Sequence, residues 1–324
     1  MSSVPLLRSL QSSVAEEEGP IDVSKEYYDC VPATGEGAQA PSLVKPNESF
    51  AHWLTSYNPL RAALAAEFLG TFLLVLLGLG GLNAATNAGA SSGVLQVALV
   101  WGFALYISIV LCEEKSGAHL NPSLTLAFLL IRRHHAGVPG GLNVKVATLY
   151  IVCQYLGALC AGMCSYATWS HSVSLYEERN GIIRGEEGSQ ASAATLCGYF
   201  PNPGFASQLG DVSAAKALSV ELLATSLLSF VVFSLTNPKV INLRMRTYIP
   251  KLLGLTLTLL VTIYAPLTGC ILNPARDLGP RTVAYFAGWR SIAFPGPHNG
   301  FWVYFVGPSA GALVGGLLAD RLLW

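Results

Sequence analysis

The chain has 324 residues, of which 52% are hydrophobic and only 12% are charged. Soluble globular proteins carry roughly 25% charged residues, so this composition excludes a water-soluble surface and indicates a protein of the lipid bilayer. Lysine and arginine together number 19, and aspartate and glutamate together also number 19. With a net charge of zero the chain lacks a basic excess, and we expect no nucleic-acid partner.

The first 58 residues differ in composition from the rest of the chain. They are rich in serine, proline and glycine and carry an acidic bias. Such a segment cannot bury enough apolar area to offset the entropy lost on ordering. We therefore expect residues 1–58 to form a mostly disordered tail and residues 59–324 to form the membrane-embedded domain.

Six apolar runs follow Pro59 and are long enough to cross a bilayer, which needs about 20 residues of helix. Four of the six contain no charged residue, which is rare in a water-soluble helix. The seven cysteines lack the paired spacing of a zinc or redox site, so we expect no metal and no cofactor. The predicted spans are residues 62–83, 94–112, 146–170, 217–237, 252–272 and 301–319.

Two further apolar segments, residues 119–131 and 273–288, are too short to cross a bilayer. Each carries an Asn-Pro pair at its start. Asparagine is a preferred helix N-cap, and proline is favoured at the first helical position because its missing N–H would be unsatisfied there. We expect two short helices, each beginning abruptly at its asparagine.

The two short segments belong to an internal repeat. Residues 116–123 resemble residues 268–275, and upstream residues 66–71 resemble residues 220–225. Each half, about 60–170 and 215–322, contains three spans, an odd number, so the second half must be inserted upside down. The predicted fold is all-α, with six transmembrane helices and two re-entrant half-helices that meet near the bilayer centre.

Basic residues predict the orientation, because short cytoplasmic loops are enriched in lysine and arginine. They gather after the second and fourth spans, whereas the loop after the third span is acidic. The predicted protein is therefore multi-pass with both termini in the cytoplasm. The basic residues are Arg132, Arg133, Lys145, Lys239, Arg244, Arg246 and Lys251, and the acidic ones are Glu177, Glu178, Glu186 and Glu187.

With two Asn-Pro motifs on inverted half-helices, residues 60–320 resemble the major intrinsic protein family, the aquaporins and aquaglyceroporins. The run Asn-Pro-Ala-Arg-Asp-Leu-Gly-Pro-Arg at 273–281 is similar to the aquaglyceroporin form, as are residues 194–203 and 288–294. The resemblance implies a passive channel and no enzyme. It implies a homotetramer in the plasma membrane that passes glycerol, water and similar small neutral solutes and excludes ions and protons.

The resemblance also implies a ring of four residues at the pore constriction: Trp101, Val261, Cys270 and Arg276. Trp101 is the choice of glycerol facilitators. Cys270 and the aromatic pair Tyr304-Phe305 are instead typical of water channels. The alternative of a water-selective aquaporin with an atypical constriction therefore stays open.

The pore motifs are predicted to act through the side chains of Asn121 and Asn273. Each side-chain carbonyl would cap its helix and leave the NH₂ group free to donate to a passing hydroxyl. Arg276 would donate to the solute and repel cations, and Trp101 would offer a wall to its carbon atoms. The complete motifs are Asn121, Pro122 and Ser123, where the family usually has alanine, and Asn273, Pro274 and Ala275.

Four more residues are predicted to support the pore. The resemblance implies that Glu67 and Glu221 accept hydrogen bonds from the loops that lead into the half-helices. Asp277, in the first turn of its helix, is favoured there by the helix dipole and is expected to act as scaffold. His119 is expected to line the cytoplasmic vestibule, with a pH gate as an alternative.

Two other classes of protein compete with a channel. A coupled transporter or membrane enzyme is disfavoured because no second ionisable group accompanies Arg276 at the expected depth of the membrane. A membrane protein with an adhesive or scaffolding role would show no permeability at all.

Overall fold

The computed structural model describes residues 58–90, 93–134, 136–237, 239 and 246–323. All of them belong to one compact unit, Tyr57–Trp324. The predicted tail, residues 1–58, lies outside the described residues except for Asn58, whose side chain caps the first helix.

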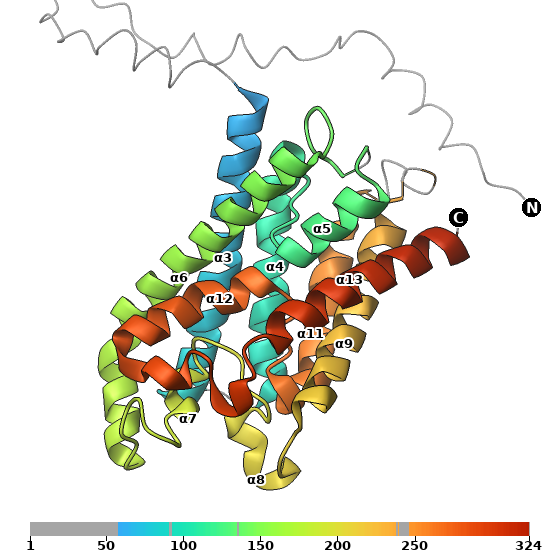
Figure 1. Ribbon diagram of the computed structural model, residues 1–324. Coiled ribbons are helices and arrows are strands. Elements are labelled where there is room, and N and C mark those ends of the chain that lie inside the picture. Colours follow the sequence, from blue (N-terminus) through green and yellow to red (C-terminus); the bar gives the residue numbers. More distant parts are fainter. Residues whose placement is uncertain (1–57, 91–92, 135, 238, 240–245, 324) are drawn as a thin grey trace, which may run out of the picture. The chain divides into compact units, whose positions relative to one another are not determined.

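Every regular element within the described ranges is helical. Six helices are long and apolar enough to cross a membrane, as predicted (Figure 1). They are α3 (Pro59–Thr86), α4 (Val94–Ser116), α6 (Val144–Arg179), α9 (Ala214–Leu235), α11 (Ile249–Thr268) and α13 (Val303–Leu322). Shorter elements are α5 (Pro122–Ile131), α7 (Gln190–Ala193), η1 (Pro203–Phe205), α8 (Ala206–Leu209), α12 (Pro274–Ala284), η2 (Tyr285–Trp289), η3 (Arg290–Ile292) and η4 (Pro297–Asn299).

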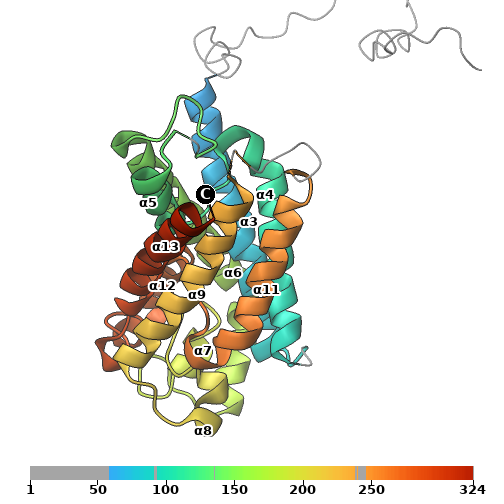
Figure 2. The ribbon, with the colours of Figure 1, turned by 90° about the vertical axis from the view of Figure 1, so that its right-hand side faces the viewer.

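The two halves of the chain pack their helices in the same way. In the first half α3 contacts α4 and α6, and in the second α9 contacts α11 and α13; Figure 2 shows α9 between α13 and α11. The halves are joined by α4 against α11 and by each short helix on the third long helix of the other half, α5 on α13 and α12 on α6. Both short helices are thus held by the opposite half.

The helices that precede the two asparagine motifs end at corresponding residues. α4 ends at Ser116 and α11 at Thr268, and each is followed by a glycine in the left-handed region, Gly117 (φ 80) and Gly269 (φ 82). This glycine ends a helix readily because it has no Cβ. The predicted spans, 94–112 and 252–272, were therefore wrong at their ends. Apolar residues continue past Gly269 although α11 does not, and α4 continues to Ser116 although charged residues begin at Glu113.

Two charges used to predict the orientation are buried. Glu177, which is buried, and Glu178 both lie within α6, which continues nine residues past the predicted end of its span, and not in the loop after it. Arg132, the residue that follows α5, pairs with Asp320 near the end of α13, and its Nη1 donates to the carbonyl of Phe233. These two charges tie helices together, and the predicted orientation depends on the remaining basic residues.

The surface of the bundle is apolar, and several polar side chains lie inside. Leucine, valine and phenylalanine side chains are exposed along the long helices, up to 71% for Leu322. Glu67, Gln154 and Glu221 are completely buried. This is the reverse of a soluble protein and suits a bundle surrounded by lipid.

Glycines let the paired helices meet backbone to backbone. A Cβ built on Gly157 of α6 would lie 2.3 Å from the carbonyl oxygen of Phe68 in α3. At the corresponding place in the second half, a Cβ on Gly311 of α13 would lie 2.4 Å from the carbonyl oxygen of Leu222 in α9. Small residues at helix contacts in membranes allow this close approach.

We expect Gly315→Ala to destabilise the protein by about 2 kcal/mol, because the new methyl group would lie 2.0 Å from the carbonyl oxygen of Ser226 and force α13 away from α9. The thermal midpoint of the purified protein in detergent measures the loss. Gly80→Ala in α3 is the matched control, since a Cβ there has nothing within 4 Å. Equal midpoints for the two variants would contradict the prediction.

Candidate functional site

A cavity of about 560 Å³ lies between the two halves of the bundle. On α4 its lining extends from Glu113 to Trp101, twelve residues or about 18 Å along the helix. A second cavity, of about 330 Å³, continues beyond Trp101. Trp101, Val261 and Arg276 line both cavities, so three of the four predicted constriction residues lie where the two spaces adjoin. Cys270 lines the first cavity.

The two asparagines lie at the starts of α5 and α12. Asn121 Oδ1 accepts from the backbone N–H of Ser123 (2.9 Å), and Asn273 Oδ1 accepts from those of Ala275 (3.0 Å) and Arg276 (3.3 Å). The predicted caps are therefore present. Both asparagines line the larger cavity.

The amide groups of these asparagines are not wholly free, contrary to the prediction. Asn121 Nδ2 donates to the carbonyl of Leu272 (2.9 Å), and Asn273 Nδ2 donates to the carbonyl of Leu120 (2.8 Å). Each amide carries two N–H groups, so one holds the opposite loop and the other has no acceptor among the described residues. The sequence could not show this, because the contacts join residues 151 and 153 positions apart.

The loops before the asparagines share an unusual backbone. Ala118, Leu120, Cys270 and Leu272 all have φ between 49 and 56, in the left-handed region that side chains other than glycine disfavour. The strained residues stand three and one positions before each asparagine. Both loops line the larger cavity, and strain of this kind persists only where the surroundings fix the conformation.

Two buried carboxylates fix these loops. Glu67 accepts hydrogen bonds from Ser116 Oγ (2.6 Å) and from the backbone N–H groups of His119 (2.9 Å) and Leu120 (2.8 Å). Gln154 Nε2 also donates to Glu67 (2.7 Å). Glu221 accepts from the corresponding positions, Thr268 Oγ1 (2.6 Å), Ile271 N (3.0 Å) and Leu272 N (2.9 Å). These are the contacts that the resemblance implied.

Arg276 lies beside Trp101, with its Cζ 4.5 Å from the centre of the indole ring. Its Nη1 donates to the carbonyl of Leu196 (3.0 Å), and the residue is 6% exposed. Within the part of the chain that the structure describes, no carboxylate lies within 4.0 Å of this guanidinium, and its other N–H groups have no acceptor. The site therefore combines unused donors with an aromatic face.

Comparison with known proteins identifies the family. The sequence profile described as "Major intrinsic protein" matches residues 54–319. The chain belongs to the major intrinsic protein family. The predicted family and the six-helix fold are thus confirmed, and membership makes the chain an integral, multi-pass membrane protein and points to a transporter rather than an enzyme.

Individual relatives agree with this assignment. The chain is 36% identical over 252 residues to a glycerol uptake facilitator protein of Pseudomonas aeruginosa, covering 77% of this chain and 84% of the relative. It is 33% identical over 273 residues to a propanediol uptake facilitator of Citrobacter freundii, covering 82% and 93%. The X-ray structure of the aquaglyceroporin from Plasmodium falciparum has the same fold, with a TM-score of 0.66 at 24% identity, covering 82% and 97%.

In this major intrinsic protein, Asp277 and Arg281 form a buried ion pair one helical turn apart on α12. Arg281 Nε lies 2.6 Å from Asp277 Oδ2, and the side chains are 1% and 0% exposed. Asp277 also accepts from the N–H of Gly198 (2.7 Å), while Arg281 donates to the carbonyls of Gly198 (2.6 Å) and Ala293 (2.9 Å). The pair fastens two loops to α12. The charge of Asp277 is matched by Arg281 and not by Arg276, and its role as scaffold stays a prediction.

Sequence reasoning missed Arg281 as a site residue and used it only as a family signature. Its spacing of four residues from Asp277 could have indicated a pair on one helix face. The loop carbonyls that complete its contacts lie 83 and 12 positions away, and no local pattern points to them.

The remaining predicted residues have mixed surroundings. Val261 and Cys270 are buried and line the larger cavity. His119 also lines it, but both ring nitrogens have partners, Thr125 Oγ1 (3.2 Å) and the carbonyl of Ala136 (2.9 Å). Ser123 lies within 3.3 Å of Ser309 Oγ on α13. His119 therefore both braces its loop and lines the larger cavity.

Proposed function

We propose that the protein is a passive channel for glycerol and other small uncharged solutes, and that it also conducts water. The observation that carries this proposal is the pairing of Arg276 with Trp101 where the two cavities adjoin. Free N–H donors on one side suit the hydroxyl groups of a polyol, and an aromatic face on the other suits its carbon atoms. The named glycerol and propanediol facilitators among the relatives support the same class of solute.

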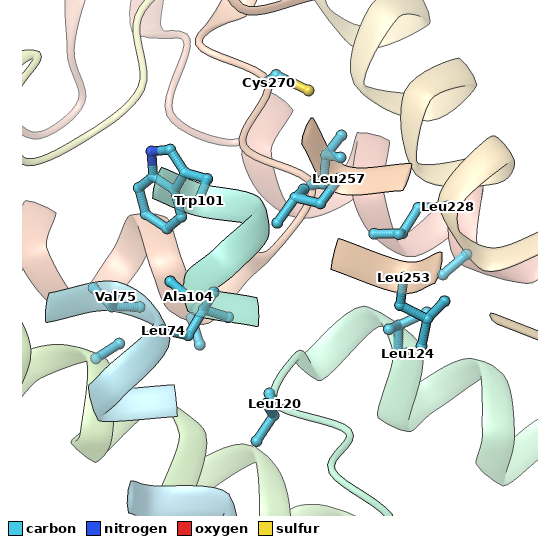
Figure 3. Packing of buried hydrophobic residues seen from close by; sticks show 14 of the residues in the cluster. Leu74, Val75, Trp101, Ala104, Leu120, Leu124, Leu228, Leu253, Leu257 and Cys270 are labelled. Atoms are coloured by element: carbon cyan, nitrogen blue, oxygen red, sulfur yellow. The ribbon is translucent and has the colours of Figure 1, made fainter. Parts of the chain in front are cut away.

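The rest of the pathway also has one apolar side and one polar side. Figure 3 shows Trp101 of α4 and Leu74 of α3 across from Leu253 and Leu257 of α11. Together with other leucines these residues give the larger cavity an apolar wall. The loops 117–120 and 269–272, with the two asparagine amides, supply the polar part of the lining. A solute that carries hydroxyls on a carbon chain can contact both at once.

Ions and protons are excluded by fixed positive charge. The N-terminal ends of α5 and α12 meet at the asparagine pair, and both helix dipoles present their positive ends there. The guanidinium of Arg276 adds a full charge that no carboxylate within 4.0 Å neutralises among the described residues. A cation loses its water shell in this space without gaining a compensating partner.

Support for the alternative, a water-selective channel, is divided. Cys270 does line the larger cavity, as in the water channels it resembles. Tyr304, however, is buried with its hydroxyl on the carbonyl of Thr268 (3.0 Å), and neither it nor Phe305 belongs to the described lining of that cavity. Tyr304 therefore packs against the end of α11 and outside the larger cavity, so it gives the water-selective alternative no support.

The assembly and location follow as parts of the proposal. The apolar outer surface fits a plasma membrane channel surrounded by lipid and by other copies in a homotetramer, with residues 59–324 as the channel domain and both termini in the cytoplasm.

Stopped-flow light scattering on reconstituted vesicles tests the function. Vesicles that contain the protein should shrink rapidly in an outward water gradient and then swell rapidly as glycerol enters, both faster than protein-free vesicles. Fast shrinkage without glycerol entry would support the water-selective alternative. Neither flux above the protein-free rate would contradict a channel for either solute.

Replacing Arg276 with alanine should lower the ratio of glycerol to water permeability about tenfold, because one charge-assisted hydrogen bond to the solute is worth roughly 1.5–3 kcal/mol. A proton leak, followed with a pH-sensitive dye inside the vesicles, should appear in the same variant. Arg179→Ala, at an exposed arginine at the end of α6, is the matched control. A ratio equal to that of the wild type would contradict the role given to Arg276.

A further inference from the structure

A second charge pair, partly buried, lies away from the pore, where α6 meets the loop that follows it. Arg184 Nη2 lies 2.7 Å from Glu177 Oε2, and its Nε lies 3.1 Å from both carboxylate oxygens. Burial on its own lowers the pKa of Arg184, but the hydrogen bonds and charge of Glu177 outweigh it and raise the pKa above the usual value. The guanidinium is therefore permanently charged.

This pair is connected to the loop that carries Leu196. Ser192 Oγ, which is buried, donates to Glu177 Oε1 (2.7 Å). Ser192 belongs to α7, and the turn that follows is closed by hydrogen bonds from Leu196 N to the carbonyl of Ala193 (2.9 Å) and from Thr195 Oγ1 to that of Ser192 (3.0 Å). Glu177 therefore fixes the position of the Leu196 carbonyl through one hydroxyl group.

The same pair is connected to the far end of the helix that carries Arg276. Trp289, which follows α12, donates through Nε1 to Ser192 Oγ (3.0 Å), and the Arg184 guanidinium lies 4.2 Å from the centre of its ring. Arg184 Nη1 also donates to the carbonyl of Ala287 (3.2 Å). One carboxylate and one guanidinium thus hold both the helix of Arg276 and the loop with its acceptor.

The Leu196 carbonyl is the only hydrogen-bond acceptor that the described residues offer to the Arg276 guanidinium. We propose that Glu177 and Arg184 are positioning residues for Arg276, which act through Ser192 and Leu196 and thereby set the selectivity of the channel. This inference rests on the proposed function. A shift of the loop would move the Leu196 carbonyl, and the Arg276 guanidinium would then turn away from the indole ring of Trp101.

Ser192→Ala tests the connection with the smallest change, since it removes one hydroxyl and leaves both charges in place. We expect the ratio of glycerol to water permeability to fall about threefold, less than the loss of a direct hydrogen bond to a charged group would give, because the hydroxyl acts on Arg276 only through the loop. Ser229→Ala is the matched control, because Ser229 is equally buried and donates to the carbonyl of Ala312 (2.7 Å) between α9 and α13. It should leave the ratio unchanged even if it lowers the thermal midpoint.

A second comparison separates positioning from general stability. On the Arg276→Ala background, Ser192→Ala should no longer change the ratio, because two residues that act through one group are not additive. Glu177→Gln keeps the size of the side chain and should lower the ratio in the same direction as Ser192→Ala. If both single variants lose thermal stability and keep the wild-type ratio, the pair is structural only and the inference is wrong.

The wild-type vesicles distinguish failure of this inference from failure of the proposed function. Glycerol entry into them above the protein-free rate supports the proposed function, and the variants are then judged by the ratio. If the wild type passes water alone, the glycerol proposal fails, and the inference is judged by the proton leak, which Ser192→Ala should raise and Ser229→Ala should not. If neither solute passes, both proposals fail together.

Discussion

Replacing Glu221 with alanine is expected to lower the free energy of unfolding by about 5 kcal/mol, because three donors to a buried charged group lose their acceptor at roughly 1.5–3 kcal/mol each. The donors are Thr268 Oγ1 and the backbone N–H groups of Ile271 and Leu272. They hold a backbone whose left-handed residues resist the native conformation. We expect little folded protein to survive solubilisation in detergent.

The yield of monodisperse protein and its thermal midpoint measure this loss. Glu221→Gln keeps one carbonyl oxygen as an acceptor and turns an NH₂ group toward a donor, so its midpoint should lie between those of the wild type and the alanine variant. Glu187→Ala, at an exposed position in the loop after α6, should leave the midpoint unchanged. If Glu221→Ala were as stable as Glu187→Ala, the carboxylate would not be what holds the loop.

The second large effect is expected at Asp277. Asp277→Ala leaves the guanidinium of Arg281, which is 1% exposed, without its carboxylate. Breaking a buried ion pair from one side costs about 3–5 kcal/mol, because the remaining charge stays out of water without a partner. The thermal midpoint should therefore fall sharply. The loop that contains Gly198, which Asp277 holds in place, should become accessible to protease.

A double replacement distinguishes loss of the pair from loss of packing. Asp277→Leu combined with Arg281→Met removes both charges and keeps much of the volume, and such replacements of buried pairs are often neutral. The double variant should therefore be more stable than Asp277→Ala alone. If the double variant is instead less stable than Asp277→Ala by the full cost of losing Arg281, the costs of the two replacements add. The two side chains then act independently, and their ion pair does not explain the stability of the protein.

The six long helices could be predicted because a bilayer requires long apolar runs, and hydropathy records such runs directly. The ends of the helices could not. α11 stops at Gly269 although apolar residues continue, and α6 continues through Glu177 although charged residues begin. Hydropathy reports the surroundings of a segment, whereas a helix end is decided by the backbone at one or two residues.

The asparagine caps could also be predicted, since a cap is a local contact between residues two or three apart. Two hydrogen bonds join the halves of the chain, from Asn121 to Leu272 and from Asn273 to Leu120. They could not be predicted, because no local sequence pattern indicates contacts between residues so far apart. The contact of Arg281 with Gly198 could not be predicted either, because those residues are also far apart in the sequence. Arg276, by contrast, could be singled out because a charged residue inside a membrane segment is costly and therefore rare.

The exchange between the two loops also has a consequence for how the molecule assembles. Leu120 is held by Glu67 in the first half and Leu272 by Glu221 in the second, and each supplies the carbonyl that orients the asparagine of the other half. Neither half contains the carbonyl group that orients its own asparagine. The first three helices can enter the membrane during synthesis, but their asparagine must wait for the last third of the chain, and the centre of the pathway is completed only when synthesis is nearly over.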